Sequence, residues 1–255
     1  MTSAPRRVRL KAPAKLNLHL RVLHKRPDGF HEIRTIFQTI SLSDVLDIEF
    51  HPGEKTEVLL KGSSDIPDNL VVRAANLLVS HLDIRGRIVM RLWKKIPMGA
   101  GLGGGSSDAA AVLLALPVLA GLDADPQDLA VWAAELGSDV PFFLAGGAAV
   151  AAGRGEELYP LPDPSPAQGL LIHPGIYIST PDAYRGLNRT PDFLLPQSEL
   201  LRFQTAAWNL AGAADAPNWA ENAVNDFESV AFQTHPALRS WKRRLRELGA
   251  KPSLM

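Results

Sequence analysis

The sequence predicts an α+β fold in which mixed strands carry helices on one side, and three observations support this prediction. Apolar and polar side chains alternate through residues 16–22, which is typical of a half-buried strand. Apolar residues recur at helical spacing through residues 69–82. A segment with five glycines, residues 97–107, joins a strand-like run at 87–96 to an apolar, helix-favouring run at 109–116.

The first half of the chain is expected to form four strands before its first helix. They lie at residues 16–22, 30–40, 41–50 and 57–60. The turn residues Pro27-Asp28-Gly29 make a hairpin of the first two strands. We expect Asp68 to cap the helix at 69–82, and Ser106 and Ser107 to offer hydroxyl caps to the helix that follows the glycine-rich segment.

The next part of the chain is expected to contain two helices, a buried segment and a boundary. Gly121 ends the helix that follows the glycine-rich segment, and the next helix begins at Asp125-Pro126 and ends at Gly137. Residues 142–152 are so apolar that they must be buried. Four prolines in residues 159–168 make this stretch the best candidate for a domain boundary.

Beyond this boundary we expect a strand at 169–180, a short helix or turn that contains Tyr184, and helices at 221–232 and 236–248. The basic residues of the last helix are expected to face solvent. Its buried stripe is expected to consist of Leu238, Trp241, Leu245 and Leu248.

The glycine-rich segment is predicted to bind the phosphates of a nucleotide. A glycine loop that leads into a helix presents backbone N–H groups at the positive end of the helix dipole. Glycine lets that backbone approach the phosphate oxygens closely. The alternative is a glycine turn with no ligand. The candidate binding residues are Pro97, Met98, Gly99, Ala100, Gly101, Leu102, Gly103, Gly104, Gly105, Ser106 and Ser107.

Two other nucleotide-binding motifs fit this segment poorly. A Walker A loop ends in Gly-Lys-Ser/Thr, and the segment contains no lysine. The residues Gly99-x-Gly101-x-x-Gly104 match the glycine pattern of a dinucleotide-binding fingerprint. That fingerprint also requires an acidic residue about 20 positions further on, at the tip of a second strand. Asp123 and Asp125 lie near that distance in a link between two helices. An NAD-dependent oxidoreductase is therefore disfavoured.

Composition limits the classes of protein that the chain can belong to. Its 255 residues allow one or two domains, and its 46% hydrophobic content is enough for a full core. A formal net charge of zero favours neither nucleic acid nor an anionic membrane as a partner. The absence of cysteine excludes disulfides and fits a reducing compartment.

The N-terminus lacks the apolar core of a signal peptide. We expect a soluble, cytoplasmic monomer or homodimer.

The polar residues of the first strand divide into two groups. Lys15 and Asn17 lie two positions apart at the start of the strand, so both can point into a site from one face. His19 and Arg21, further along, are expected to be solvated. Asp139 lies just beyond a predicted helix end, and its residue type fits both a turn former and a functional carboxylate.

Three separated stretches resemble the GHMP kinases, which are small-molecule kinases unrelated to the P-loop and protein-kinase folds. They are residues 12–17 together with 28–31, residues 97–107, and residues 137–143. Residues 179–184 and 225–228 resemble the family more loosely. The resemblance implies the two-domain GHMP kinase fold, with an ATP-binding domain similar to ribosomal protein S5 domain 2 at 1–160 and a C-terminal α/β domain at 161–255.

The resemblance also implies a reaction and its residues. The branch of the family with these stretches transfers the γ-phosphate of ATP, with Mg²⁺, to a hydroxyl of a small alcohol linked to cytidine diphosphate. Lys15 and Asp139 match the catalytic pair. The metal ligands are not implied. Asn17 and His31 match substrate-contacting positions, and Phe30 and Tyr184 match the aromatic positions that flank the cytosine.

One departure from the family pattern lies at the C-terminus. The family has a third glycine-rich motif after a segment like residues 249–255, and the sequence stops at Met255. We therefore expect an incomplete, truncated C-terminal domain. Two alternative functions follow from this departure and from the breadth of the family: a catalytically impaired nucleotide-binding module, and a GHMP kinase for another small alcohol.

Overall fold

The computed structural model describes residues 4–62, 68–212 and 219–255. The chain forms two compact units, and each of them combines segments that are far apart in sequence. The first unit consists of Met1–Lys15 and Thr39–Gly146, and the second of Leu16–Gln38 and Gly147–Met255. The sequence-domain boundary near residue 160 stays a prediction.

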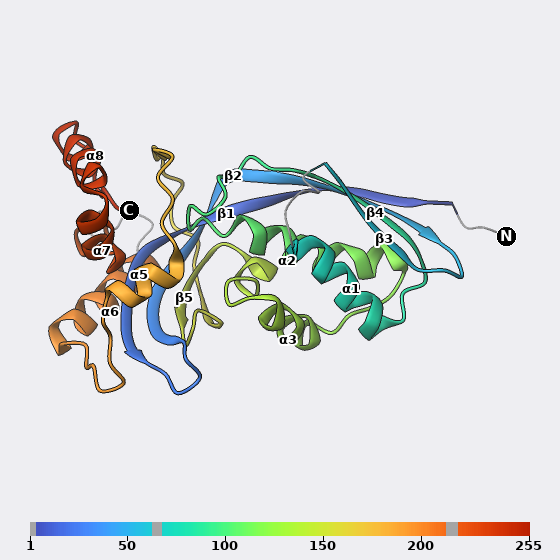
Figure 1. Cartoon of the computed structure of the whole chain (residues 1–255), viewed down its shortest axis with the longest axis horizontal. Coiled ribbons are helices and arrows are strands. Elements are labelled where there is room, and N and C mark those ends of the chain that lie inside the picture. Colours follow the sequence, from blue (N-terminus) through green and yellow to red (C-terminus); the bar gives the residue numbers. More distant parts are fainter. Residues whose placement is uncertain (1–3, 63–67, 213–218) are drawn as a thin grey trace. The chain divides into compact units, whose positions relative to one another are not determined.

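Figure 1 shows the helices and strands in chain order. Up to residue 146 they are β1 (Arg6–Lys25), β2 (His31–Pro52), β3 (Glu57–Gly62), α1 (Leu70–Leu82), β4 (Gly86–Trp93), α2 (Gly104–Ala120), α3 (Pro126–Leu136) and α4 (Phe142–Ala145). The later ones are β5 (Ala148–Ala152), β6 (Glu157–Leu161), α5 (Thr180–Gly186), α6 (Gln197–Gly212), the 3₁₀ helix η1 (Trp219–Asn222), α7 (Phe227–Thr234) and α8 (Pro236–Glu247).

In the first unit, β4 pairs antiparallel with the second half of β2 and parallel with β3. Ile48 and Met90 face each other across the β2–β4 pair, and both are fully buried. The helices α1 and α2 lie side by side next to these strands (Figure 1). The helix α2 is apolar on nearly every side, and such a helix forms the centre of a core instead of covering its surface.

In the second unit, the first half of β2 pairs antiparallel with β5, which in turn pairs with β6. The helix α6 packs Phe203 and its apolar neighbours against Leu18 and Ile36. A second apolar cluster contains Leu20, Val22 and Ile33, with Tyr184, Leu187 and Phe227 packed against it.

Two expectations for the first half of the chain are wrong in detail. The strands expected at 30–40 and 41–50 form one continuous strand, β2. The cap of α1 is Asn69, whose Oδ1 accepts a hydrogen bond of 3.0 Å from the Val71 N–H. Asp68 lies one residue before the cap and adopts a left-handed conformation (φ 50°).

The helix ends that depend on local signals are mostly confirmed. Asp125 caps α3 by accepting from the Gln127 N–H, and Gly121 ends α2 in the left-handed conformation. The start of α2 differs from the expectation, because the helix begins at Gly104 after Gly103 and not at the serines. The glycines supply the turn by themselves, so no side-chain cap is needed there.

The second unit contains most of the wrong expectations. Residues 169–178 contain neither strand nor helix, and the sequence did not indicate α6. Only the last part of the helix expected at 221–232 forms, as α7. Trp241 in α8 and Leu248 just after it are exposed, and α8 has no buried residue, so the expected stripe is not buried.

The expected solvation of His19 and Arg21 is also wrong. His19 is fully buried and packs edge-on against Phe203, with ring centroids 5.3 Å apart. This burial, together with the charge of Arg21, lowers the pKa of the His19 imidazole to about 4. Arg21 forms ion pairs with Asp226 and Glu199. The polar face of β1 is thus covered by helices that come from late in the chain.

The buried imidazole makes the stability of the fold sensitive to acid. The folded-state pKa of His19 lies below its ordinary value, so the unfolded chain takes up the proton first. The free energy of unfolding is therefore unaffected by protonation of His19 above about pH 6.5. It falls by about 3 kcal/mol as the pH decreases from there toward 4. We expect His19→Gln to lose correspondingly less stability over this range in urea denaturation. His173→Gln, at an exposed histidine, should follow the parent protein.

Candidate active site

The glycine-rich segment lines a pocket of about 330 Å³ in the first unit. All the predicted phosphate-binding residues from Pro97 to Ser106 line it. Ser107 does not, because its side chain is buried inside the first turn of α2. Lys94 and Asp108 also line the pocket, so it combines a glycine-rich wall with charged side chains.

The backbone of the segment explains why glycine occurs at every second position. Gly99, Gly101 and Gly103 have φ angles of 69°, 72° and 69°. This left-handed region is costly for residues with a Cβ. The segment therefore folds back on itself beside the N-terminus of α2, where backbone N–H groups attract anions.

Gly103 is also the point where the glycine-rich segment packs most closely on its surroundings. A Cβ at this position would lie 2.8 Å from the Phe143 ring and 3.1 Å from Cγ of Lys15. The N–H of Lys15 donates a hydrogen bond of 2.9 Å to the Leu102 carbonyl. These contacts pack the glycine-rich segment against α4 and against Lys15, the residue at which the first unit's part of β1 ends.

Lys15 and Asp139 meet next to these contacts. Lys15 Nζ lies 3.3 Å from Oδ2 of Asp139, and the two side chains are 7% and 33% exposed. Asp139 lies in the turn between α3 and α4, so it belongs to a turn and also carries a specific ionic partner. The turn position confirms that Asp139 is a turn residue, and its functional role stays a prediction.

A second charged cluster lies at the end of β4 and was missed in the sequence. The fully buried Asp44 accepts hydrogen bonds from Lys94 Nζ and from the backbone N–H groups of Lys95 and Ile96. Lys94 Nζ also donates to Asp108 Oδ2 at 2.7 Å. The available signal was a carboxylate within the strand-like run of residues 41–50.

The charges of this cluster shift one another's protonation. Burial raises the pKa of the Asp108 carboxyl to about 6, and Asp44 adds to the rise while Lys94 opposes it. Burial alone would lower the pKa of Lys94, but its bonds to Asp108 and Asp44 outweigh burial and raise it. Lys94 therefore remains a cation that joins the end of β4 to the N-terminal part of α2.

The remaining candidate residues lie in the second unit. His31 and Tyr184 stack on each other, with centroids 4.9 Å apart and ring planes 17° apart. Phe30 is 50% exposed and lies beneath the Arg154 guanidinium, which is 4.8 Å from its ring centroid. The Asn17 amide donates to Thr35 Oγ1 at 2.8 Å. The structure thus pairs His31 with Tyr184 and gives Phe30 a different partner.

Within residues 4–62, 68–212 and 219–255, no helix is long and apolar enough to cross a bilayer. The same residues contain no group of three or more His, Cys, Asp or Glu side chains arranged to hold a metal ion.

The chain is similar to known proteins of one family. Residues 69–147 match the family description "GHMP kinases N terminal domain". A 4-diphosphocytidyl-2-C-methyl-D-erythritol kinase of Solibacter usitatus (strain Ellin6076) is 52% identical over 257 aligned positions, which cover 99% of this chain and 79% of the relative.

Solved structures show the same likeness. A crystal structure of 4-(cytidine 5'-diphospho)-2C-methyl-D-erythritol kinase is similar with a TM-score of 0.76 and 38% identity, over 97% of this chain and 86% of that one. A homoserine kinase from Cytophaga hutchinsonii ATCC 33406 has a TM-score of 0.64 at 19% identity, over 97% and 82% of the two chains, and shows the shared fold alone.

A glycine loop of this form, packed beside a lysine–aspartate pair, together with these likenesses defines a small-molecule kinase of the GHMP class. The predicted fold class is confirmed. The chain belongs to the 4-diphosphocytidyl-2-C-methyl-D-erythritol kinase family. It is therefore a phosphotransferase with an alcohol acceptor and ATP as a substrate. The alternatives, an impaired module and a kinase for another alcohol, are not favoured.

The packing around Gly103 can be tested against a matched position in the same loop. Gly101→Ala places a Cβ in open space, so it carries only the left-handed backbone strain, about 1 kcal/mol. Gly103→Ala adds the contacts with Phe143 and Lys15 and should cost about 3 kcal/mol. Urea denaturation measures both costs. Equal costs for the two variants would contradict the packing described here.

Proposed function

We propose that the protein uses ATP to phosphorylate the 2-hydroxyl group of 4-diphosphocytidyl-2-C-methyl-D-erythritol, a step of non-mevalonate isoprenoid precursor synthesis. The observation that supports this proposal most directly is the Lys15–Asp139 ion pair, packed against the glycine-rich segment within one unit. We expect the enzyme to act in the cytoplasm as a monomer or homodimer, with no nucleic acid or membrane partner.

ATP would bind through the glycine-rich segment, residues 97–107. The N–H groups at the start of α2 and in the turns before it would hold the phosphates, and the left-handed glycines leave room for the phosphate oxygens. Lys94, which lines the same pocket, would offset the negative charges of Asp44 and Asp108 next to the nucleotide.

Asp139 would act on the attacking alcohol. Its carboxylate would accept a hydrogen bond from the hydroxyl group, orient it toward the γ-phosphorus, and take its proton as the new P–O bond forms. The bond from the γ-phosphorus to the β,γ-bridging oxygen would break at the same time, and ADP would leave with that oxygen. Lys15, whose Nζ lies 3.3 Å from Asp139, would offset negative charge on the transferred phosphoryl oxygens. Because phosphoryl transfer passes through a loose transition state, the positions of these groups matter more than their basicity.

The pocket also fits a nucleotide-bound Mg²⁺. This ion usually takes one or two protein carboxylates and completes its shell with phosphate oxygens and water. Oδ1 of Asp108 is buried without a hydrogen-bond partner, and Asp108 lines the pocket, so Asp108 would be the protein ligand. When bound, the ion neutralises phosphate charge.

The alcohol substrate would be recognised by Asn17, Phe30, His31 and Tyr184 through its cytidine and erythritol groups. Aromatic faces at positions 30, 31 and 184 offer stacking surfaces for the cytosine ring, each stack being worth about 1–3 kcal/mol. Burial lowers the pKa of His31, and the charges of Lys25 and Arg189 lower it further. The imidazole is therefore neutral at pH 7 and can both donate and accept a hydrogen bond at a cytosine edge.

A direct assay tests the proposed function. The purified chain is incubated with ATP, Mg²⁺ and 4-diphosphocytidyl-2-C-methyl-D-erythritol, and the phosphorylated product is followed by ³¹P NMR. Homoserine and mevalonate serve as competing alcohols. We expect transfer to the cytidine compound alone, and preferential transfer to either plain alcohol would refute the proposal.

The role of Asp139 is tested by Asp139→Asn. The amide keeps the size of the side chain but cannot take a proton, so kcat should fall roughly 10²–10⁴-fold while the Kd for ATP stays within about twofold. Steady-state kinetics and calorimetric titration measure these two effects. Asp128→Asn, at an exposed position of α3, is the matched control and should retain full turnover. Normal turnover in Asp139→Asn would remove Asp139 from the mechanism.

A further inference from the structure

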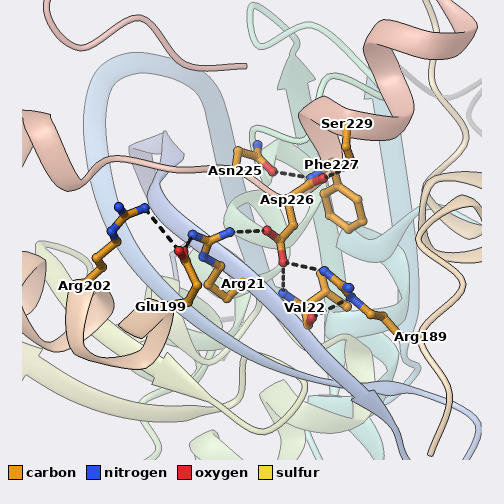
Figure 2. Close-up of polar contacts among 9 residues, drawn as sticks. All are labelled: Arg21, Val22, Arg189, Glu199, Arg202, Asn225, Asp226, Phe227 and Ser229. Carbon is orange, nitrogen blue, oxygen red and sulfur yellow. Dashed lines mark hydrogen bonds and ion pairs between the residues drawn. The ribbon is translucent and has the colours of Figure 1, made fainter. Parts of the chain in front are cut away.

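The second unit contains a buried carboxylate, Asp226, that is bonded by donors from separate segments (Figure 2). Its Oδ1 accepts from Arg21 Nη1 at 2.7 Å. Its Oδ2 accepts from the Val22 N–H at 2.9 Å and from Arg189 Nη2 at 3.3 Å. The side chain is 6% exposed, so these bonds replace nearly all of its contact with water.

The backbone around Asp226 is fixed to the same strand. The Asp226 N–H donates to the Leu20 carbonyl at 3.1 Å, and the Leu20 N–H donates to the Val224 carbonyl at 2.7 Å. Leu20 and Asn225 form an isolated parallel bridge. Side chain and backbone together therefore hold the start of α7 on β1.

This attachment determines where an aromatic group lies. Phe227, the first residue of α7, packs its ring edge-on against Tyr184, with centroids 4.9 Å apart. Tyr184 in turn stacks on His31. We call His31, Tyr184 and Phe227 the aromatic group. Two of its three rings belong to residues with a proposed role at the cytidine, and the third supports Tyr184 from its edge.

Arg189 extends the attachment to the segment that follows α5. Its Nε donates to the Val22 carbonyl at 3.1 Å, next to the bond from Nη2 to Asp226 (Figure 2). Tyr184 lies in α5, five residues before Arg189. Asp226 therefore holds the chain on both sides of the Tyr184 ring: α7 through its own backbone, and the end of α5 through Arg189.

The carboxylate of Asp226 offsets the charges of two arginines. Arg21 is shared between Asp226 and Glu199 of α6, Glu199 also pairs with Arg202, and Arg189 bonds to Asp226. An amide at position 226 would leave Arg21 to share Glu199 with Arg202, and would remove the carboxylate that pairs with Arg189. Removing one partner of such a buried pair is costly because the remaining charge stays desolvated.

We propose that Asp226 is a positioning residue for substrate recognition, which orients the aromatic group toward the cytidine of the alcohol substrate. This inference rests on the proposed function. It assigns Asp226 no contact with the reacting atoms. It predicts a selective effect, because the contacts of Asp226 are with the elements that carry the aromatic group, whereas the glycine-rich segment is held by contacts within the first unit.

The experiment compares the kinetics of Asp226→Asn with those of the parent enzyme. We expect the KM for 4-diphosphocytidyl-2-C-methyl-D-erythritol to rise roughly tenfold, the loss expected for hydrogen bonds to a charged group. The KM for ATP should stay within about twofold, and kcat should change less than the substrate KM. Equilibrium titration with each substrate separately should show the same division between the two Kd values.

Glu228→Gln is the matched control in the same helix. Glu228 also forms a half-buried ion pair, but its partner is Lys242 of α8 and not the aromatic group. This variant should leave both KM values unchanged. Arg189→Lys is a milder second variant, because lysine keeps the cation but lacks the two separate nitrogens with which Arg189 bonds to Val22 and Asp226. It should raise the substrate KM roughly threefold, and it serves if Asp226→Asn does not fold.

The outcomes separate the inference from the proposed function. Equal rises in both KM values, a lowered melting temperature with both KM values unchanged, or a comparable effect of Glu228→Gln would each overturn the role of Asp226. A parent enzyme that fails to phosphorylate the cytidine compound would overturn the proposed function, and the inference with it.

Discussion

The close packing at Gly103 is the constraint on which the geometry of the first unit depends. Its left-handed backbone turns the glycine-rich segment into α2, and the space of a Cβ at this position is already occupied by Phe143 and the stem of Lys15. Phe143 lies in α4, and the turn that leads into α4 carries Asp139. One set of contacts therefore determines the path of the loop and also the meeting of the lysine with the aspartate. A loop that only bound phosphate would need the fixed loop path, but it would not need the contact between Lys15 and Asp139.

The strand β1 adds a covalent constraint to this packing. Lys15 is the last residue that β1 contributes to the first unit, and Leu16 is the first that it contributes to the second. Asn17 lies two residues after Lys15, so the two side chains share one face of the strand. The strand therefore carries two of the proposed site residues in neighbouring positions of one face, one from each unit.

The sequence predicted the features that depend on neighbouring residues. The cap at Asp125 and the glycine-rich loop have all their determinants within about ten positions, and the structure contains both. The burial of His19 and the pairing of Arg21 could not be predicted in this way. They depend on Phe203 and Asp226, which lie 184 and 205 positions further along the chain. An alternating strand pattern shows that two faces differ, but it cannot show that a distant helix covers the polar face. For the same reason the sequence left the role of Asp139 open.

Two of the buried carboxylates, Asp44 and Asp226, have a common arrangement. Asp44 accepts from two backbone N–H groups and one lysine, and Asp226 accepts from one backbone N–H group and two arginines. A buried carboxylate is tolerated only when such donors replace its water, and several donors in fixed directions leave it little freedom. Asp44 thereby holds the strand end before the glycine-rich segment, and Asp226 holds the helix beside the aromatic group. An apolar residue could fill either space, but it could not fix the direction of a backbone N–H group. The carboxylates at these two places are therefore best explained by a requirement for orientation, because apolar side chains could satisfy the requirement for packing.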